Sequence, residues 1–378
     1  MAGSDLAGWL KGANVLTPLT KKTSTVSYSP RISVFPVVLF LFVWVFPAAP
    51  LRAESPPAPA AKIYDTFTVY WENDVFARTD QDYTNGLRFT WSTPYHLDPD
   101  ASRLPEWSRP WLKRLPGGDP GEARAVSLSF GQSIYTPVDI KESEPNPSDR
   151  PYGGYSYLAA SFHNRSRNTK TTWEFQAGIV GPLSFAEEFQ NVTHDLVGSS
   201  RAAGWDNQLK NEPALEVICE RHWLLAHADD ELGLSFDVIP HLGGRLGNVS
   251  TYLNLGGELR WGWQLPHNFG TCPIRPGCDS NSAFNEAAPR PFRPGLSSWH
   301  LFAAMDGRAV FHDIFLDGNT FADSQHVKRE IIVADFMSGI AVQYGVTRVT
   351  YSYVLRTREF ESQKTRQLFG ALSFSWSY

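Results

Sequence analysis

Large apolar and small polar side chains alternate along the final segment of the chain, residues 366–378. A repeat of two residues places alternate side chains on opposite faces of a β-strand. The apolar face holds Leu368, Leu372, Phe374, Trp376 and Tyr378, and the other face holds Gln367, Ala371, Ser373, Ser375 and Ser377. A soluble sheet shows the same alternation. However, an apolar outside, a polar inside and aromatic residues at strand ends are what a lipid-facing barrel needs.

Similar patterns recur along the rest of the chain and predict eleven further strands. The twelve predicted segments are 65–75, 83–93, 124–134, 152–164, 171–180, 212–226, 229–241, 249–263, 298–311, 331–343, 345–357 and 366–378. An even number of antiparallel strands closes into a single-chain bacterial barrel, and closure removes the sheet edges that hydrocarbon does not tolerate. The predicted fold class is therefore all-β: an antiparallel transmembrane β-barrel of about twelve strands.

Two segments interrupt this pattern. Residues 93–123 are rich in Pro and Trp and are too long for a tight turn. Residues 183–198 predict the one clear helix, with Ser184 as N-cap, Glu187 completing a capping box and Gly198 at the end. Its apolar stripe consists of Phe185, Phe189, Val192 and Leu196. A single helix between strands is unexpected in a pure pore and raises the question of a further function.

The N-terminal region contains the longest apolar run, 33–47, which follows several basic residues. Basic residues, a short apolar core and a small residue at the cut predict a signal peptide over 1–53, cleaved after Ala53; the alternative is a membrane anchor. Residues 54–62 then form a Pro/Ala-rich leader, and 63–378 form the barrel. Export through a signal peptide, together with a lipid-facing barrel, predicts the outer membrane of a Gram-negative bacterium as the location.

Composition excludes some partners. The mean hydropathy of −0.28 argues against a protein made of membrane-spanning helices. The net charge of −5 becomes about −9 without residues 1–53, so nucleic acid, which needs clustered basic surface, is not an expected partner. Cys272 and Cys278 lie in a Pro/Gly-rich loop and could pair after export, whereas Cys219 is most simply a packed thiol.

Candidate chemistry lies in the helix and at the first two strands. Gln190 and His194 are four residues apart and share a helical face, as a general base and a helping amide would. Asn73 and Asp74 end the first strand and offer oxygen ligands suited to calcium, and Thr84 is predicted beside them. The alternatives are an ordinary surface or packed histidine and a strand end with turn-forming residues. Motifs of soluble hydrolases (G-x-S-x-G, HExxH) are absent from the sequence.

Several segments, in the same order, resemble the lipid A 3'-O-deacylase family of outer-membrane barrels. They are ENDVF (72–76), TDQDYTNGL (79–87), GQSIYTPVD (131–139), DRPYGGYSYL (149–158), GIVGP (178–182), EFQNVTH (188–194), GWDNQLKNEPAL (204–215) and TREFE (357–361). They span almost all of the predicted mature chain.

The resemblance implies a twelve-stranded barrel with its active site between the outer-leaflet side of the wall and a loop helix. It implies calcium-dependent hydrolysis of the ester that holds the 3'-linked acyl or acyloxyacyl group of lipid A. The family's catalytic positions fall on Asn73, Asp74, Thr84, Gln190, His194 and, more loosely, Lys141. Calcium is then expected at Asn73, Asp74 and Thr84, lipopolysaccharide is the expected substrate, and outer-membrane lipids surround the barrel.

The sequence departs from the family after the helix, where Ser200 and Ala202 stand in place of a Glu and a Tyr. That change leaves acyl preference and activity level open. Two alternatives to the deacylase therefore remain: a porin or structural barrel without activity, and a barrel phospholipase. The oligomeric state does not follow from the sequence.

Overall fold

The computed structural model describes residues 65–73, 83–98, 100, 104–117, 122–197, 201–229, 233–271 and 296–378. The chain divides into two compact units, Met1–Glu54 and Ser55–Tyr378, and only the second contains described residues. The predicted signal peptide, the leader, and Cys272 and Cys278 lie outside the described residues. Cys219, which is described, is free and half-buried.

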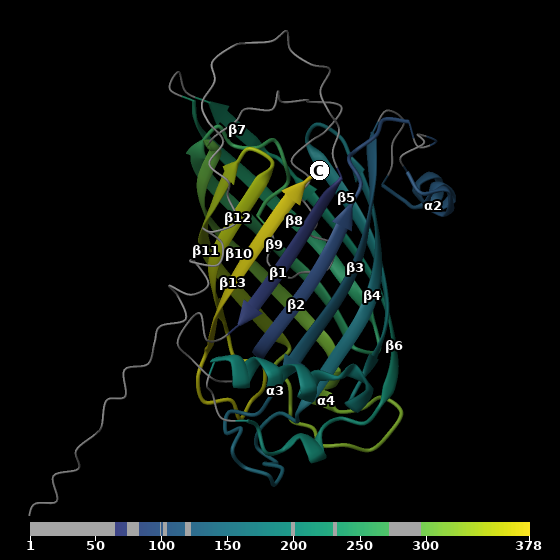
Figure 1. Ribbon diagram of the computed structural model, residues 1–378, viewed down its shortest axis with the longest axis vertical. Helices are drawn as coiled ribbons and strands as arrows, with labels where there is room; N and C mark the ends of the chain where they lie inside the picture. Colours follow the sequence, from purple (N-terminus) through teal and green to yellow (C-terminus); the bar gives the residue numbers. More distant parts are fainter. Residues whose placement is uncertain are drawn as a thin grey trace, which may run out of the picture. The chain divides into compact units, whose positions relative to one another are not determined.

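The second unit is a β-barrel, because its antiparallel sheet closes on itself (Figure 1). β1 pairs with both β2 and β13, and β6 pairs with β8, which joins the two ends of the strand order. The strands are β1 (Thr66–Asn73), β2 (Tyr83–Ser92), β3 (Ala123–Tyr135), β4 (Gly153–Arg165), β5 (Thr169–Val180), β6 (Glu212–Trp223), β7 (Ala226–Asp229), β8 (Leu234–Gly247), β9 (Ser250–Trp263), β10 (Leu296–Asp313), β11 (Ile332–Tyr344), β12 (Thr347–Arg356) and β13 (Gln367–Ser377). β7 pairs only with β8, so twelve strands form the closed wall.

The predicted fold class is confirmed, and most predicted strand boundaries lie within two residues of the observed ones. The clearest error is the strand expected at 229–241. The chain there forms the short β7, and β8 runs from Leu234 to Gly247. β8 extends this far because only Asn248 and Val249 separate it from β9, so the two strands form a tight hairpin.

Alternation along each strand separates a lipid-facing outside from a polar inside, as predicted for the last strand. On β13, Trp376 is 47% exposed on the outside, whereas Ser375 is 3% exposed on the inside. Ser375 and Ser377 accept or donate hydrogen bonds across to Thr68 and Thr66 of β1. The outward apolar residues are accommodated by hydrocarbon, and the inward polar residues pair with one another.

Paired charges fill much of the interior. Arg356 donates to Asp335 at 2.8 Å and to Glu359 at 3.3 Å, and Arg150 donates to the same Glu359 at 2.5 Å. Deeper in the wall, Arg88 pairs with Glu174 at 3.1 Å. A cavity of about 130 Å³ remains beside Asp335, Arg356 and Glu359. An interior filled in this way differs from the water-filled lumen of a porin.

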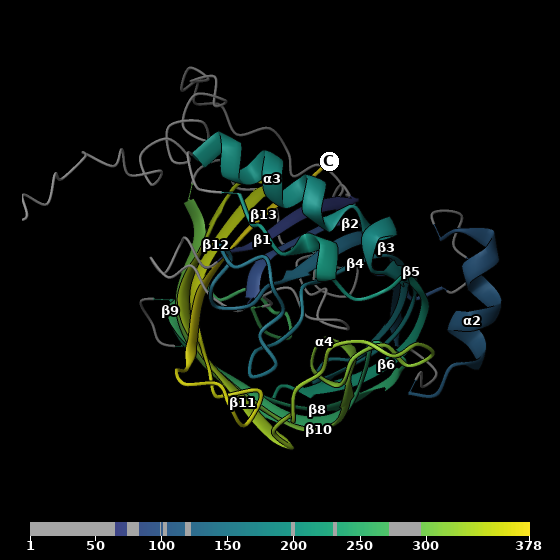
Figure 2. The same ribbon diagram turned by 90° about the horizontal axis from the view of Figure 1, so that it is seen from below.

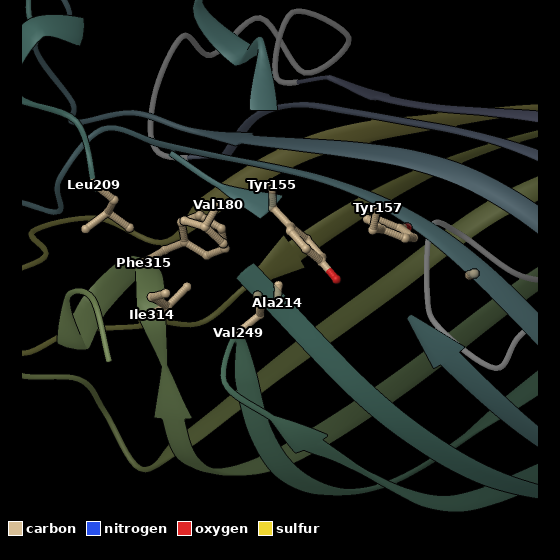
Figure 3. Packing of buried hydrophobic residues seen from close by; sticks show 9 residues of the cluster. Tyr155, Tyr157, Val180, Leu209, Ala214, Val249, Ile314 and Phe315 are labelled. Atoms are coloured by element: carbon tan, nitrogen blue, oxygen red, sulfur yellow. The ribbon is translucent and has the colours of Figure 1, made fainter. Parts of the chain in front are cut away.

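An apolar plug covers one end of the interior. The short helix α4 (Ile314–Asp317) follows β10 and turns Ile314 and Phe315 toward inward-facing Tyr155, Val180 and Val249 (Figure 3). Phe315 also stacks on Tyr135 with ring centroids 4.0 Å apart. The plug lies at the end where β1, β3 and β5 finish and β2, β4 and β6 begin. We call this end the helix end.

Two helical segments pack on the outside of the wall. One comprises the 3-10 helix η2 (Glu106–Ser108) and α2 (Arg109–Arg114); the other comprises η3 (Pro182–Ser184) and α3 (Ala186–Val197). A further 3-10 helix, η4 (Trp205–Asn207), follows α3. Figure 2 shows α3 outside the ring of strands, alongside β13, β1 and β2. Within the described ranges, none of the helices has the length and apolar character needed to cross a membrane.

Candidate active site

The predicted loop helix is confirmed as α3, but its predicted start is wrong. Ser184 belongs to η3, and Phe185 adopts a left-handed conformation (φ 57°) before α3 begins at Ala186. The capping box at Ser184 and Glu187 therefore does not form. The reason is that the carbonyl of Ser184 is held by the barrel wall, which bends the chain before the helix.

Polar side chains on the outward face of the wall hold this bend in place. Gln132 of β3 and Ser156 of β4 each donate to the carbonyl oxygen of Ser184 at 2.7 Å. Gly154 lies beneath the helix, and a Cβ atom there would come within 2.1 Å of the Cβ of Ala186. Polar groups facing lipid are costly unless they are hydrogen-bonded. The wall is therefore polar where α3 docks, and the absence of a side chain at Gly154 lets the helix approach the strand closely.

Gln190 lies on the docked face of α3 and is 1% exposed. Its Oε1 accepts a hydrogen bond from Nε1 of Trp205 at 2.8 Å. An indole nitrogen is only a donor, so this bond fixes the amide with its oxygen toward Trp205 and its NH₂ away. Nε2 of Gln190 has no hydrogen-bond partner among the described residues. The site therefore contains a buried donor whose direction is set by Trp205.

His194, one helical turn further on, is also buried (6% exposed). At the end of β1, the buried Asn73 lies opposite the buried Asn85 of β2 on the outward side of the wall. Asn85 is held by Trp71, whose Nε1 donates to Oδ1 at 3.0 Å. α3 lies outside the ring of strands at the end of the barrel where β1 finishes and β2 begins (Figures 1 and 2).

The structure gives less information about the other predicted site residues. Asp74 and Ser200 lie outside the described residues. Thr84 is the extra residue of an irregularity between Tyr83 and Asn85 in the pairing of β2 with β3. Lys141 is exposed on the loop 136–152.

That loop is fastened to the segment after α3. The backbone N–H of Ala203 donates to the carbonyl of Ile140 at 2.8 Å, and the hydroxyl of Tyr152 donates to the same oxygen at 3.2 Å. Burial raises the pKa of Tyr152 to about 12, so its hydroxyl keeps the proton that it donates. The backbone just before Lys141 is therefore held to the segment that follows α3, although the side chain of Lys141 is exposed.

Charges also fix the far end of α3. Arg201 donates to both carboxylate oxygens of Asp195, at 3.0 and 2.5 Å, and this bond lowers the pKa of Asp195. Ala202 packs against the cluster of Ile134, Tyr152, Ala186 and Trp205. At the position where the family resemblance expects a tyrosine, this chain therefore has a small residue that packs beside the tryptophan holding Gln190.

Sequence reasoning missed four residues that shape the site: Gln132, Ser156, Trp205 and Asn85. Gln132 and Ser156 carry a usable signal, because they place polar side chains at outward positions next to the apolar Phe130 and Leu158. Trp205 carries no such signal, since its contact with Gln190 depends on the path of the chain after α3.

The fold and this arrangement define an outer-membrane β-barrel with a docked helix on its outer wall. A family model described as outer membrane protein LpxR matches residues 37–378. The chain therefore belongs to the LpxR family of outer membrane proteins, which confirms the family resemblance carried by its motifs.

Solved structures agree on the fold. LpxR from Salmonella typhimurium superimposes with a TM-score of 0.64 at 18% identity, covering 82% of this chain and 99% of that one. The beta domain of the Bordetella autotransporter BrkA follows with a TM-score of 0.40 at 8% identity, covering 83% of this chain and 99% of that one. The second value is too low to inform function. No curated protein matches the sequence significantly.

Proposed function

We propose that this protein is a calcium-dependent hydrolase that removes the 3'-linked acyl or acyloxyacyl group from lipid A. The observation that carries the proposal is the burial of Gln190 and His194 on the face of α3 that docks against the outer wall. A site outside the barrel is reached from the membrane rather than through the lumen. Membership of the LpxR family supports the same substrate.

His194 is the base in this proposal. A ring nitrogen of His194 takes a proton from a water molecule as the water attacks the ester carbonyl, and later returns it to the departing sugar oxygen. General bases of this kind contribute about 10²–10⁴-fold in rate. Nε2 of Gln190 is a buried donor without a partner among the described residues, so it is suited to the oxygen that becomes negative during the attack. No serine nucleophile is needed.

The residues at the end of β1 suit calcium by their chemistry. The amide oxygen of Asn73, the carboxylate of Asp74 and the hydroxyl of Thr84 would hold the ion, since calcium prefers oxygen ligands. Burial of Asn73 next to Asn85 places two amides where lipid-facing residues would otherwise be apolar. Among the described residues, no group of three or more His, Cys, Asp or Glu forms a metal site. When bound, calcium supplies positive charge beside the ester carbonyl.

The direct test is to incubate the purified, refolded barrel with lipid A and calcium and to measure the lipid by mass spectrometry. The expected result is a mass lower by one acyl or acyloxyacyl group, with the loss located at the 3' position by fragmentation. Unchanged lipid A, with a barrel shown to be folded by its heat-modifiable gel mobility, would falsify the proposal.

Parallel measurements separate the two alternatives. Release of fatty acid from phosphatidylethanolamine, with lipid A left intact, identifies a barrel phospholipase. Steady conductance in planar bilayers without hydrolysis identifies a pore. The charge-filled interior and the plug at Phe315 and Ile314 argue against the pore.

A further inference from the structure

We propose that the segment 104–117, which contains η2 and α2, is a membrane foot: a rigid element seated in the headgroup region of the phospholipid leaflet at the end of the barrel opposite α3. The foot lies outside the ring of strands, beside β4 and β5 (Figures 1 and 2). It has no part in the proposed catalytic site.

The foot is fixed to the outward face of the wall. Leu104 and Leu112 are fully buried against Val126 of β3 and Phe162 of β4. A second attachment comes from the wall itself, since Nε1 of Trp173 donates to the carbonyl oxygen of Pro116 at 2.9 Å. The segment therefore does not move freely in the periplasm but is held where lipids meet the barrel.

The side chains that remain exposed on the foot match a membrane interface. Trp107 and Trp111 each pack on Phe162 with ring centroids 6.0 Å apart, yet each remains 48% exposed. The segment carries three basic residues, Arg109, Lys113 and Arg114, and one acidic residue, Glu106. Lys113 pairs with Asp100 at 2.8 Å, and the remaining excess of positive charge flanks the two indoles. Indoles beside cationic side chains are characteristic of the headgroup level of a bilayer.

The height of the foot on the wall supports the same occupant. Val126, under the foot, and Ile134, under α3, both face outward on β3 and lie eight residues apart. At 3.3 Å per residue and a tilt near 40°, that separation is about 20 Å along the membrane normal, slightly less than the roughly 25 Å apolar band of such barrels. Between them, the outward side chains of Leu128 and Phe130 are exposed. The foot and α3 therefore bracket the hydrocarbon.

Continuity with this bare wall favours lipid over a protein partner. On β4, the outward Phe162 is covered by the foot, whereas the outward Leu158, four residues away, is 66% exposed. A protein docked on the foot would also contact the lipid that covers the exposed wall next to it. Phospholipid headgroups cover the foot without any break in the membrane.

Depth-dependent fluorescence quenching tests the proposal. The full mature barrel and its Trp107→Phe/Trp111→Phe variant are refolded into phosphatidylcholine vesicles with bromines at defined acyl positions. Phe preserves packing on Phe162, and the difference between the two proteins isolates two of the eleven tryptophans that remain after residues 1–53, with Trp9 and Trp44, are removed. We expect this difference signal to fall about two-fold or more with bromines near the carbonyl end of the chain, and much less with bromines near the chain terminus or with aqueous iodide.

Two single variants calibrate the scale. Trp261→Phe reports an exposed tryptophan of the wall on β9, and Trp205→Phe reports one that is buried under α3. Quenching of the difference signal by iodide with no effect of brominated lipid would overturn the foot and indicate a surface facing water, for a protein partner or a second copy. Stronger quenching by deep than by shallow bromines would also overturn it. Each single substitution of Trp107 and Trp111 supplies the measurement if the double variant does not fold.

Discussion

The two segments docked on the outer wall, the foot at residues 104–117 and the η3–α3 segment, use the same strands in opposite ways. The foot covers apolar wall residues with apolar side chains, as Leu112 does on Phe162. The η3–α3 segment docks on polar wall residues, with Gln132 and Ser156 donating to Ser184. Both elements are helical, short and amphipathic, so their shape does not distinguish them.

The difference teaches where chemistry is to be sought on this barrel. Apolar docking needs no directional partners and serves to hold position. Polar docking in a lipid-facing place has a desolvation cost, and buried polar groups persist there only when they are paired or used. Nε2 of Gln190 has no hydrogen-bond partner among the described residues, and its direction is set by the bond from Trp205 to Oε1 of the same amide. The active site is accordingly expected under α3.

The largest expected effect comes from removing the base. His194→Ala should lower the rate of lipid A deacylation by about 10²–10⁴-fold, because the attacking water loses its proton acceptor. The matched control is His326→Ala, which alters an exposed loop histidine at the same end of the barrel. Equal activity of the His194 variant and wild type would place the chemistry elsewhere.

Removal of calcium should have the next largest effect. Chelation with EGTA is expected to lower activity by roughly 10²-fold or more, since a bound cation contributes several kcal/mol to stabilising the developing charge. Addition of calcium, but not of magnesium, should restore it. Asn73→Ala should raise the calcium concentration needed for half-maximal rate. Full activity in EGTA would contradict the metal role of Asn73, Asp74 and Thr84.

A smaller effect is expected from the residue that orients Gln190. Trp205→Phe removes the indole donor while keeping an aromatic ring against Tyr152. Loss of one hydrogen bond of about 1 kcal/mol should lower kcat by roughly five- to tenfold with KM nearly unchanged, because the amide no longer holds its NH₂ toward the site. An equal fall in thermal stability and in both kinetic constants would indicate a packing role instead.

The smallest effect belongs to the foot. Trp107→Phe/Trp111→Phe should change kcat in detergent micelles by less than about two-fold, since the foot lies at the opposite end of β3 and β4 from α3. If this variant loses deacylation activity in micelles as well as in vesicles, the foot and the η3–α3 segment are coupled through the wall. The foot then contributes to catalysis and does not only hold the barrel in position.

The strand pattern could be predicted because lipid on one side and packed polar groups on the other impose a repeat of two on every wall segment. The existence of α3 was predictable from the helical period of its apolar stripe, but Phe185 and Val192 of that stripe are exposed, whereas Gln190 and His194 are buried. Its start was not predictable, because it depends on Gln132 and Ser156 holding the carbonyl of Ser184 across two strands. The role of Trp205 was hidden for the same reason: no local pattern records a contact 15 residues away.

Docking of α3 on the outside of the wall has a consequence for how a lipid reaches the site. A site in the lumen or in the periplasm would require each acyl chain to leave the bilayer, at about 0.8 kcal/mol per CH₂, or roughly 10 kcal/mol for a chain of a dozen carbons. In the proposed mechanism, the tails stay in hydrocarbon at the outer wall while the ester meets His194. Encounter is then a search in two dimensions, governed by the lateral diffusion and packing of the leaflet rather than by any concentration in water.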